Sequence, residues 1–123
     1  METIFSESHK LRHSKTELFG GQLVEPFERP SRAEYIINRI REVDLGPVNV
    51  PEEFGMGPIL AVHDTDFVDF LQVAWTDWQA EGFKGEAIPT VWPARRMSAR
   101  IPSFIEGRLG HYALSCETSI SEG

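Results

Sequence analysis

The chain has 123 residues, of which 41% are hydrophobic and 25% charged, and its 19 acidic against 12 basic residues give a formal net charge of −7. A chain of this length supports one domain at most, with a limited core. The acidic balance argues against binding to nucleic acids or anionic membranes, since both need a basic surface. It is compatible with a cationic partner, although acidic balance is common among soluble proteins.

The cysteine count and the first residues indicate a cellular compartment. Cys116 is the single cysteine, so no intramolecular disulfide can form, and this favours a reducing environment. The opening residues (METIFSESHK) lack the basic and apolar segments of a secretory signal, and no apolar run is long enough to span a bilayer. We therefore expect a cytoplasmic protein.

The chain begins with a short apolar segment, residues 3–5, that predicts a first strand. Residues 6–30 are polar and rich in turn-forming residues, among them the pair Gly20-Gly21. We interpret this stretch as a long loop, and long loops within compact domains tend to be functional.

A helix is predicted after this loop. Ser31 and Glu34 have the spacing of a capping box, in which the serine accepts a hydrogen bond from a free backbone N–H and the glutamate reaches back. Apolar residues then recur at helical period as far as Val43, and Gly46-Pro47 is expected to end the helix. Residues 48–50 (Val-Asn-Val) are expected to form a second short strand.

The strongest periodic pattern follows Asp64 or Thr65, either of which can cap a helix. Apolar side chains recur there as one stripe, which Gly82 closes. The stripe consists of Phe67, Phe70, Leu71, Ala74, Trp75 and Trp78. Because burial of each large side chain stabilises by roughly 1.5–3 kcal/mol, this helix needs a substantial partner surface.

Residues 82–102 combine three prolines, two glycines and three arginines. Neither a helix nor a central strand tolerates this mixture, so we expect an extended arm. A last helix is predicted over residues 106–118. Its inward side chains are expected to be Leu109, Tyr112, Ala113 and Cys116. Residues 119–123 have the composition of a linker.

Several common catalytic motifs are absent from the sequence, including Cys-x-x-Cys, His-Glu-x-x-His, the dinucleotide and phosphate loops and the nucleophile elbow. His9 and His13 are four residues apart, with Glu7 and Glu17 nearby, and this set would suit a metal if the segment were helical. The neighbouring residues disfavour a helix, so ordinary loop histidines are the simpler interpretation.

Two carboxylates stand out on the last predicted helix. Glu106 and Glu117 are eleven residues apart, which is three helical turns, so on one continuous helix they would share a face about 16 Å apart. Such a pair could hold an elongated polycation through charge-assisted hydrogen bonds. It could equally be an ordinary solvated acidic face, and the spacing leaves both interpretations open.

Several segments carry a resemblance to a known family. They are residues 4–12 (IFSESHKLR), 15–21 (KTELFGG), 26–34 (PFERPSRAE), 62–71 (VHDTDFVDFL), 82–88 (GFKGEAI), 92–96 (WPARR) and 100–107 (RIPSFIEG). Together they resemble the N-terminal region of bacterial acetylpolyamine amidohydrolases, a branch of the histone deacetylase superfamily. The arm is the most specific part, because ordinary histone deacetylases lack this insertion.

The resemblance implies an α/β fold of the arginase and deacetylase type, with three layers and a parallel sheet between helices. Residues 1–123 would be the N-terminal part of that domain, ending before the core strands, with an inserted arm at about residues 82–105. The implied activity is deacetylation of acetylated polyamines by a zinc ion that polarises the acetyl carbonyl and activates water. A homodimer is implied as well, in which the arm of each protomer narrows the partner's active-site entrance.

The family's substrate-binding residues match specific positions of this sequence. By this resemblance, Glu17 lies in the first loop at the tunnel mouth, and Glu106 and Glu117 correspond to acidic positions that bind ammonium groups. Phe19 stands where a relative has tyrosine, so a hydroxyl contact is lost there. Phe27 matches an aromatic residue beside the pocket.

The zinc ligands and catalytic groups of the family have no counterpart here. The tandem His-His, the Asp-x-His pair, a further ligating Asp and the transition-state Tyr lie downstream of the matching region, and no two histidines of this chain are adjacent. Zinc needs about three protein ligands, so we expect this chain alone to bind no metal and to be inactive. Without the core strands, the stripe over residues 67–75 would lack its partner, and the chain would self-associate, stay partly molten or occur only within a larger assembly.

Two alternatives to a polyamine deacetylase remain. The chain could be a standalone oligomerising or binding module that holds a cationic ligand without catalysis. The longer parent protein could instead deacetylate lysine side chains of proteins, or other small amides, and use the arm only to dimerise. None of these interpretations predicts a nucleic-acid or membrane partner.

Overall fold

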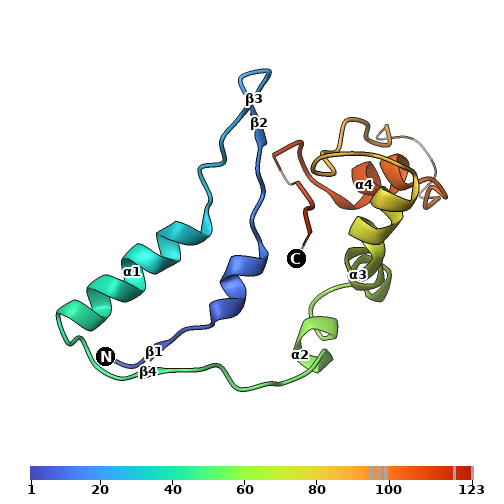
Figure 1. The fold of residues 1–123 in the computed structure, drawn as a ribbon. Coiled ribbons are helices and arrows are strands. Elements are labelled where there is room, and N and C mark those ends of the chain that lie inside the picture. The colour runs from blue at the N-terminus through green and yellow to red at the C-terminus, as the bar shows by residue number, and fades with distance from the viewer. Residues whose placement is uncertain (95, 97, 99, 118, 123) are drawn as a thin grey trace.

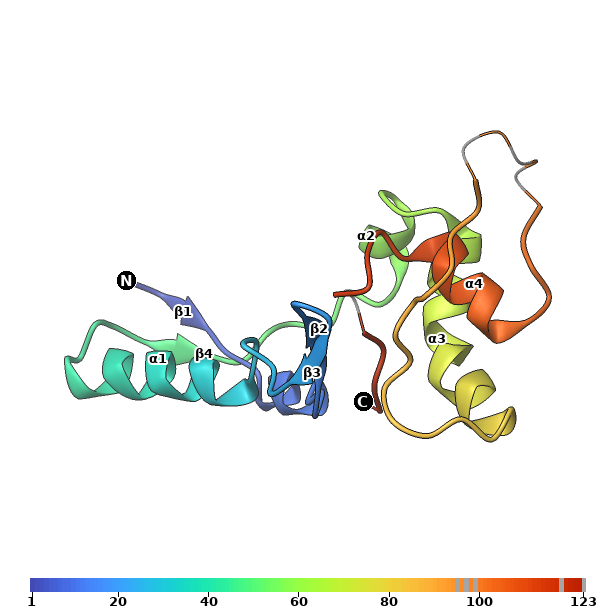
Figure 2. The ribbon, with the colours of Figure 1, turned by 90° about the horizontal axis from the view of Figure 1, so that it is seen from above.

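The computed structural model describes residues 1–94, 96, 98, 100–117 and 119–122, and its elements form two groups (Figures 1 and 2). The first group holds β1 (Thr3–Ile4), the 3₁₀ helix η1 (Glu7–Leu11), β2 (Glu17–Phe19), β3 (Gln22–Val24), α1 (Pro30–Glu42) and β4 (Val48–Asn49). The second group holds α2 (Gly57–Leu60), α3 (Thr65–Ala80) and α4 (Ile105–Tyr112). Among the described residues, no helix combines the length and apolar character that a bilayer crossing requires.

β1 and β4 form a small parallel sheet, in which Thr3 pairs with Val48 and Ile4 with Asn49. The backbone N–H of Phe5 extends the pairing by donating to the Asn49 carbonyl at 2.9 Å. Parallel neighbours need a long crossover, and here the connection contains α1. Both predicted strands are confirmed, each ending one residue earlier than the sequence pattern indicated.

The prediction of a continuous loop over residues 6–30 is wrong in two places. Residues 7–11 form η1, whose N-cap Ser6 accepts a hydrogen bond from the backbone N–H of Ser8 at 3.1 Å. β2 and β3 then pair as an antiparallel hairpin around Gly20 and Gly21. The φ angles of these two glycines, 58° and 79°, suit a two-residue hairpin turn in which both central residues have left-handed backbone conformations.

α1 begins two residues earlier than the capping-box pattern predicts. Its N-cap is Arg29, no side chain caps it, and Pro30 occupies the first turn, where its fixed φ suits a helix. The Ser31–Glu34 capping box is therefore wrong. The Glu34 carboxylate lies instead 3.1 Å from Lys10 Nζ, so it ties α1 to η1.

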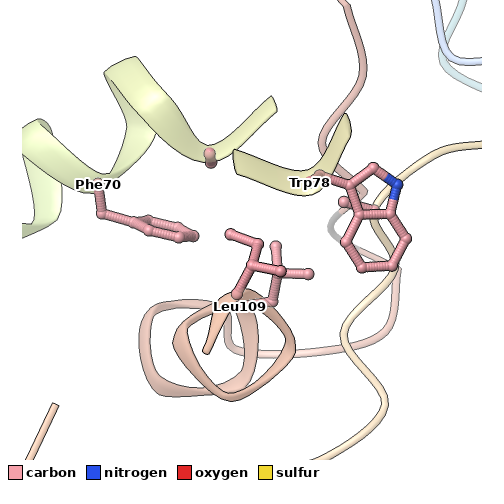
Figure 3. Packing of buried hydrophobic residues seen from close by; sticks show 6 residues of the cluster. Phe70, Trp78 and Leu109 are labelled. Carbon is pink, nitrogen blue, oxygen red and sulfur yellow. The ribbon is translucent and has the colours of Figure 1, made fainter. Parts of the chain in front are cut away.

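The main hydrophobic core lies between α3 and α4, where Leu109 of α4 is placed between Phe70 and Trp78 of α3 (Figure 3). The buried cluster consists of Phe70, Ala74, Trp78, Ala87, Ile105 and Leu109. The expectation that the α3 stripe would lack a partner is thus wrong for Phe70, which α4 and the arm cover, whereas Phe67 and Trp75 are half-buried against the same cluster. Leu71 is the exception, at 47% exposed.

Polar groups reinforce the contact between these two helices. Arg108 Nη1 donates to Asp77 Oδ2 at 2.6 Å, and the Tyr112 hydroxyl donates to Asp66 Oδ2 at 3.1 Å. The Tyr112 ring also stacks on Phe70, with centroids 4.5 Å apart. Burial, followed by the hydrogen bond to Asp66, raises the pKa of Tyr112. The α3–α4 pair is therefore held along its length by apolar and polar contacts.

The described residues of the segment between α3 and α4, which is the predicted arm, form no helix or named strand, and the segment runs beside the helix pair before it reaches α4 (Figure 2). It packs closely on α4 at Gly110, where a Cβ would lie only 1.5 Å from the Val91 carbonyl oxygen. Trp92 Nε1 also donates to the Ala113 carbonyl at 2.9 Å. Arg95, one of the three arginines on which the predicted arm rested, lies outside the described residues, as do Met97 and Ala99.

The predicted helix over residues 106–118 is too long. α4 ends at Tyr112, and Ala113 is extended, with φ −92° and ψ 141°. Of the expected inward residues, Leu109 is fully buried, whereas Tyr112, Ala113 and Cys116 are half-buried. Thr118 and Gly123 lie outside the described residues, but the predicted linker is wrong for Ser119, which is buried, and for Ile120, which pairs with Ala87.

Replacing Leu109 with alanine is expected to lower the free energy of unfolding by about 2–5 kcal/mol, because the surrounding core closes incompletely around the cavity. Leu114→Ala is the matched control, since Leu114 is 97% exposed and its loss is expected to change stability by less than about 0.5 kcal/mol. Urea unfolding followed by tryptophan fluorescence measures both. Equal effects of the two substitutions would contradict this core.

Candidate functional site

The β2–β3 hairpin brings together three of the predicted substrate-binding residues. Glu17 opens β2, Phe19 closes it, and Phe27 follows β3. Glu17 Oε2 accepts a hydrogen bond from the backbone N–H of Phe27 at 3.2 Å. The rings of Phe19 and Phe27 meet edge to face, with centroids 5.6 Å apart.

Both rings of this hairpin cluster are open to solvent, with 58% of Phe19 and 62% of Phe27 exposed. A carboxylate beside exposed aromatic faces can attract a cation twice, through its charge and through the ring quadrupoles. The methylene chain of an alkylammonium would gain from apolar contact with the same rings. The cluster composed of Glu17, Phe19 and Phe27 therefore has the chemistry of a site for a slender organic cation.

The structure places the other two predicted residues on different elements. Glu106 is exposed in the first turn of α4, whereas Glu117 is exposed in the turns that follow this helix. The argument that both carboxylates share one helical face is wrong, because α4 ends five positions before Glu117. Their binding of ammonium groups stays a prediction that rests on the family resemblance.

Glu86 is a half-buried residue of the arm that makes tertiary contacts which no sequence pattern indicated. Its Oε1 accepts a hydrogen bond from the backbone N–H of Lys15, and its Oε2 accepts one from the Thr16 hydroxyl at 2.8 Å. Partial burial alone would raise the pKa of Glu86, but the hydrogen bonds from Lys15 and Thr16 stabilise its charged form and hold the pKa below its usual value. No motif or periodicity marks this residue, because its partners are distant in sequence.

A hollow of about 770 Å³ opens beside Glu86. Residues of η1, of the hairpin, of α3 and of the chain end line it, including Lys10, His13, Lys15, Leu23, Trp75, Glu86 and Glu122. Its charged groups have both signs, which does not favour a small ion of either charge. The hollow therefore lies at the boundary between the two groups of elements.

His9 and His13 do not form the metal pair that the sequence left open. His9 Nδ1 lies 2.7 Å from the Ser6 carbonyl oxygen, and His13 Nδ1 lies 3.3 Å from Lys15 Nζ. Since η1 ends at Leu11, the two histidines do not share a helical face. Within the described part of the chain, no group of three or more His, Cys, Asp or Glu side chains is arranged to hold a metal.

Adding zinc to this chain is expected to leave its melting temperature unchanged, because a ligand stabilises only a fold that contains its site. Differential scanning fluorimetry with and without zinc measures the shift, and magnesium serves as the control ion. A rise seen with zinc and lost in His9→Ala and His13→Ala would show that these histidines do bind the metal.

Curated relatives match this chain over its whole length. No family model matches it. The chain is 51% identical to acetylpolyamine amidohydrolase from Mycoplana ramosa and 45% identical to acetylpolyamine amidohydrolase 2 from Pseudomonas aeruginosa. Each alignment covers 100% of this chain and 36% of the relative, so the chain spans about a third of the length of these proteins.

A solved structure supports the fold in the same way. The chain is similar to the crystal structure of acetylpolyamine aminohydrolase from Burkholderia pseudomallei, with a TM-score of 0.79 and 28% sequence identity. The superposition covers 95% of this chain and 33% of that structure. The predicted resemblance to the N-terminal region of these enzymes, and the α/β deacetylase-type fold, are confirmed.

Proposed function

With the match to the N-terminal region of acetylpolyamine amidohydrolases as the premise, we propose that the whole protein containing this chain hydrolyses the acetyl amide of acetylated polyamines. The observation that carries the proposal is the hairpin cluster, in which Glu17 is combined with the exposed rings of Phe19 and Phe27. Residues 1–123 form the N-terminal part of the deacetylase domain in this proposal. The enzyme would act in the cytoplasm, with no nucleic-acid or membrane partner.

The substrate has two chemically distinct ends, a neutral acetyl amide and at least one ammonium group. In the proposal, Glu17, Glu106 and Glu117 attract the ammonium groups, and the rings of Phe19 and Phe27 contact the methylene chain. A charged carboxylate that pairs with an ammonium contributes roughly 1.5–3 kcal/mol when the hydrogen bond is well made. These acidic side chains would thereby hold the ammonium end of the substrate at the active-site entrance while the acetyl amide enters.

The family resemblance implies that zinc supports the hydrolysis. The described residues of this chain do not fit a zinc site, since they provide no cluster of ligands. We therefore assign no reaction step to this chain and propose that, on its own, it binds no zinc and is inactive. Its proposed contribution is to recognise the substrate at the entrance.

We also propose that the arm, at about residues 82–105, joins two protomers into a homodimer. Apolar side chains along it are open to solvent, and apolar patches of this kind are typical of protein interfaces. The exposed fractions are 54% for Val91, 43% for Trp92, 44% for Ile101 and 47% for Phe104. A dimer built through the arm would narrow the entrance to slender substrates.

The whole protein is expected to deacetylate acetylputrescine with a higher kcat/KM than an acetyl-lysine peptide, because a narrow acidic entrance favours a thin, cationic substrate. Acetate release from each substrate measures the two values. Faster turnover of the peptide would support a protein deacetylase instead. Binding of putrescine without hydrolysis of either substrate would support the non-catalytic binding module.

Glu106→Gln in the whole protein is expected to raise the KM for acetylputrescine roughly tenfold with little change in kcat, since a lost contact to the ammonium weakens binding of substrate and transition state alike. Glu52→Gln is the matched control, because Glu52 is also exposed but lies in the loop before α2. Steady-state kinetics measures both variants. An unchanged KM in the Glu106 variant would identify this residue as an ordinary solvated carboxylate.

A further inference from the structure

Three segments that are far apart in the sequence meet at the root of the arm. Glu86 accepts hydrogen bonds from the Lys15 backbone N–H and the Thr16 hydroxyl, which joins the arm to the segment before β2. Ala87 and Ile120 exchange two backbone hydrogen bonds, of 2.9 and 3.1 Å, which joins the arm to the segment after α4. The Glu86 contacts connect the second group of elements to the first, whereas the Ala87–Ile120 pair lies within the second group.

A third contact closes the junction. The hydroxyl oxygens of Ser14 and Ser119 lie 3.2 Å apart, and both residues are buried, at 6% and 8% exposed. Each of the three segments therefore bonds to both of the others. A closed set of three contacts resists shear, because no segment can move without breaking bonds to two neighbours.

The Glu86 carboxylate has a geometric role in this junction. Its two bonds come from a backbone N–H and a hydroxyl, which are neutral donors. In the described part of the chain, it forms no ion pair with a Lys, Arg or His side chain, although Lys15 lines the adjoining hollow. The two donors belong to the neighbouring residues Lys15 and Thr16, so the two hydrogen bonds fix the direction of the backbone as it enters β2.

The residues that follow these contacts are those proposed to bind substrate. Glu17 comes directly after Thr16 and opens β2. Glu117 precedes the buried Ser119 by two positions. The junction thus lies next to two carboxylates that come from opposite ends of the chain.

We propose that Glu86 is a positioning residue that couples the root of the arm to the segments carrying Glu17 and Glu117. It holds the hairpin cluster and the chain after α4 at a set separation, so that an ammonium group meets both carboxylates in a prepared arrangement. This inference rests on the proposed function, because only there do these carboxylates bind substrate. Glu86 itself contacts no substrate.

Two variants of the whole protein separate geometry from charge. Glu86→Ala removes both acceptors and is expected to raise the KM for acetylputrescine about tenfold, with kcat unchanged. Glu86→Gln keeps an oxygen for the Lys15 N–H and can donate its amide N–H to the Thr16 hydroxyl oxygen, so its KM is expected to stay within about twofold of the wild type. Glu81→Ala, at an exposed position just after α3, is the control.

A neutral substrate, N-propylacetamide, completes the kinetic test. Its KM is expected to be the same in the wild type and in Glu86→Ala, because it carries no ammonium group for Glu17 or Glu117. An equal loss with both substrates would overturn the inference and indicate general destabilisation. Equal defects in the Ala and Gln variants would overturn it as well, since the negative charge alone would then explain the effect.

Amide hydrogen exchange tests the junction without any turnover. Glu86→Ala is expected to speed exchange in residues 14–19 while leaving that of α1 unchanged, because only the former segment loses its hydrogen bonds to the arm. Unchanged exchange in residues 14–19 would overturn the inference. If the wild type hydrolyses no acetylated amine, the proposed function fails, and this measurement still decides whether Glu86 holds the junction.

Discussion

Burial of the apolar face of α3 is the constraint on which the arrangement of the second group of elements depends. Phe70, Ala74 and Trp78 lie on one face of this helix and can leave water only if another element covers them. α4 provides Leu109, and the arm provides Ala87. The arm must therefore return along the helix pair before it reaches α4, and this path brings its root to the segment before β2. The position of Glu86 beside Lys15 and Thr16 therefore follows from the apolar packing between α3, α4 and the arm.

The first group of elements has no comparable core. Ile37 is its one fully buried large hydrophobic side chain among the described residues, whereas Ile4, Tyr35 and Ile36 are 59%, 74% and 60% exposed. Strands of two or three residues cannot stabilise such surfaces by themselves. This distribution fits a chain that spans 36% of its relatives' length and whose open faces would pack against further parts of an α/β fold. The hydrogen bonds that the described residues form between the two groups all lie at the junction around Glu86.

Long periodic elements were predictable from the sequence, and short or remotely determined ones were not. α1 and α3 follow from apolar spacing, but the β2–β3 hairpin has three residues per strand, too few for alternation to be detected. The end of α4 was missed because the apolar period continues beyond it. The carbonyl of Ala113 accepts a hydrogen bond from Trp92 in the arm, a contact that no local pattern encodes.

The candidate site shows the same division. Resemblance to a family singled out Glu17, Phe19 and Phe27, but the hairpin that brings them together was interpreted as a loop. Glu86 had no signal at all, because its partners lie 70 and 71 positions away. Spacing arguments failed for Glu117 as soon as the helix was found to end earlier. The sequence thus identified candidate site residues, but it did not predict the secondary structure and tertiary contacts that bring them together.

The closing pair between Ala87 and Ile120 also has a consequence for biosynthesis. Domains made on the ribosome emerge at roughly 5–20 residues per second, and locally connected units form before distant partners appear. The α3–α4 core lies within residues 65–120, so it is complete as soon as Ile120 has left the exit tunnel. By then β1 and β4 have also emerged, and the two-stranded sheet that they form leaves an edge on either side. A nascent chain would thus present a finished helical unit beside a two-stranded template to which later strands can be added.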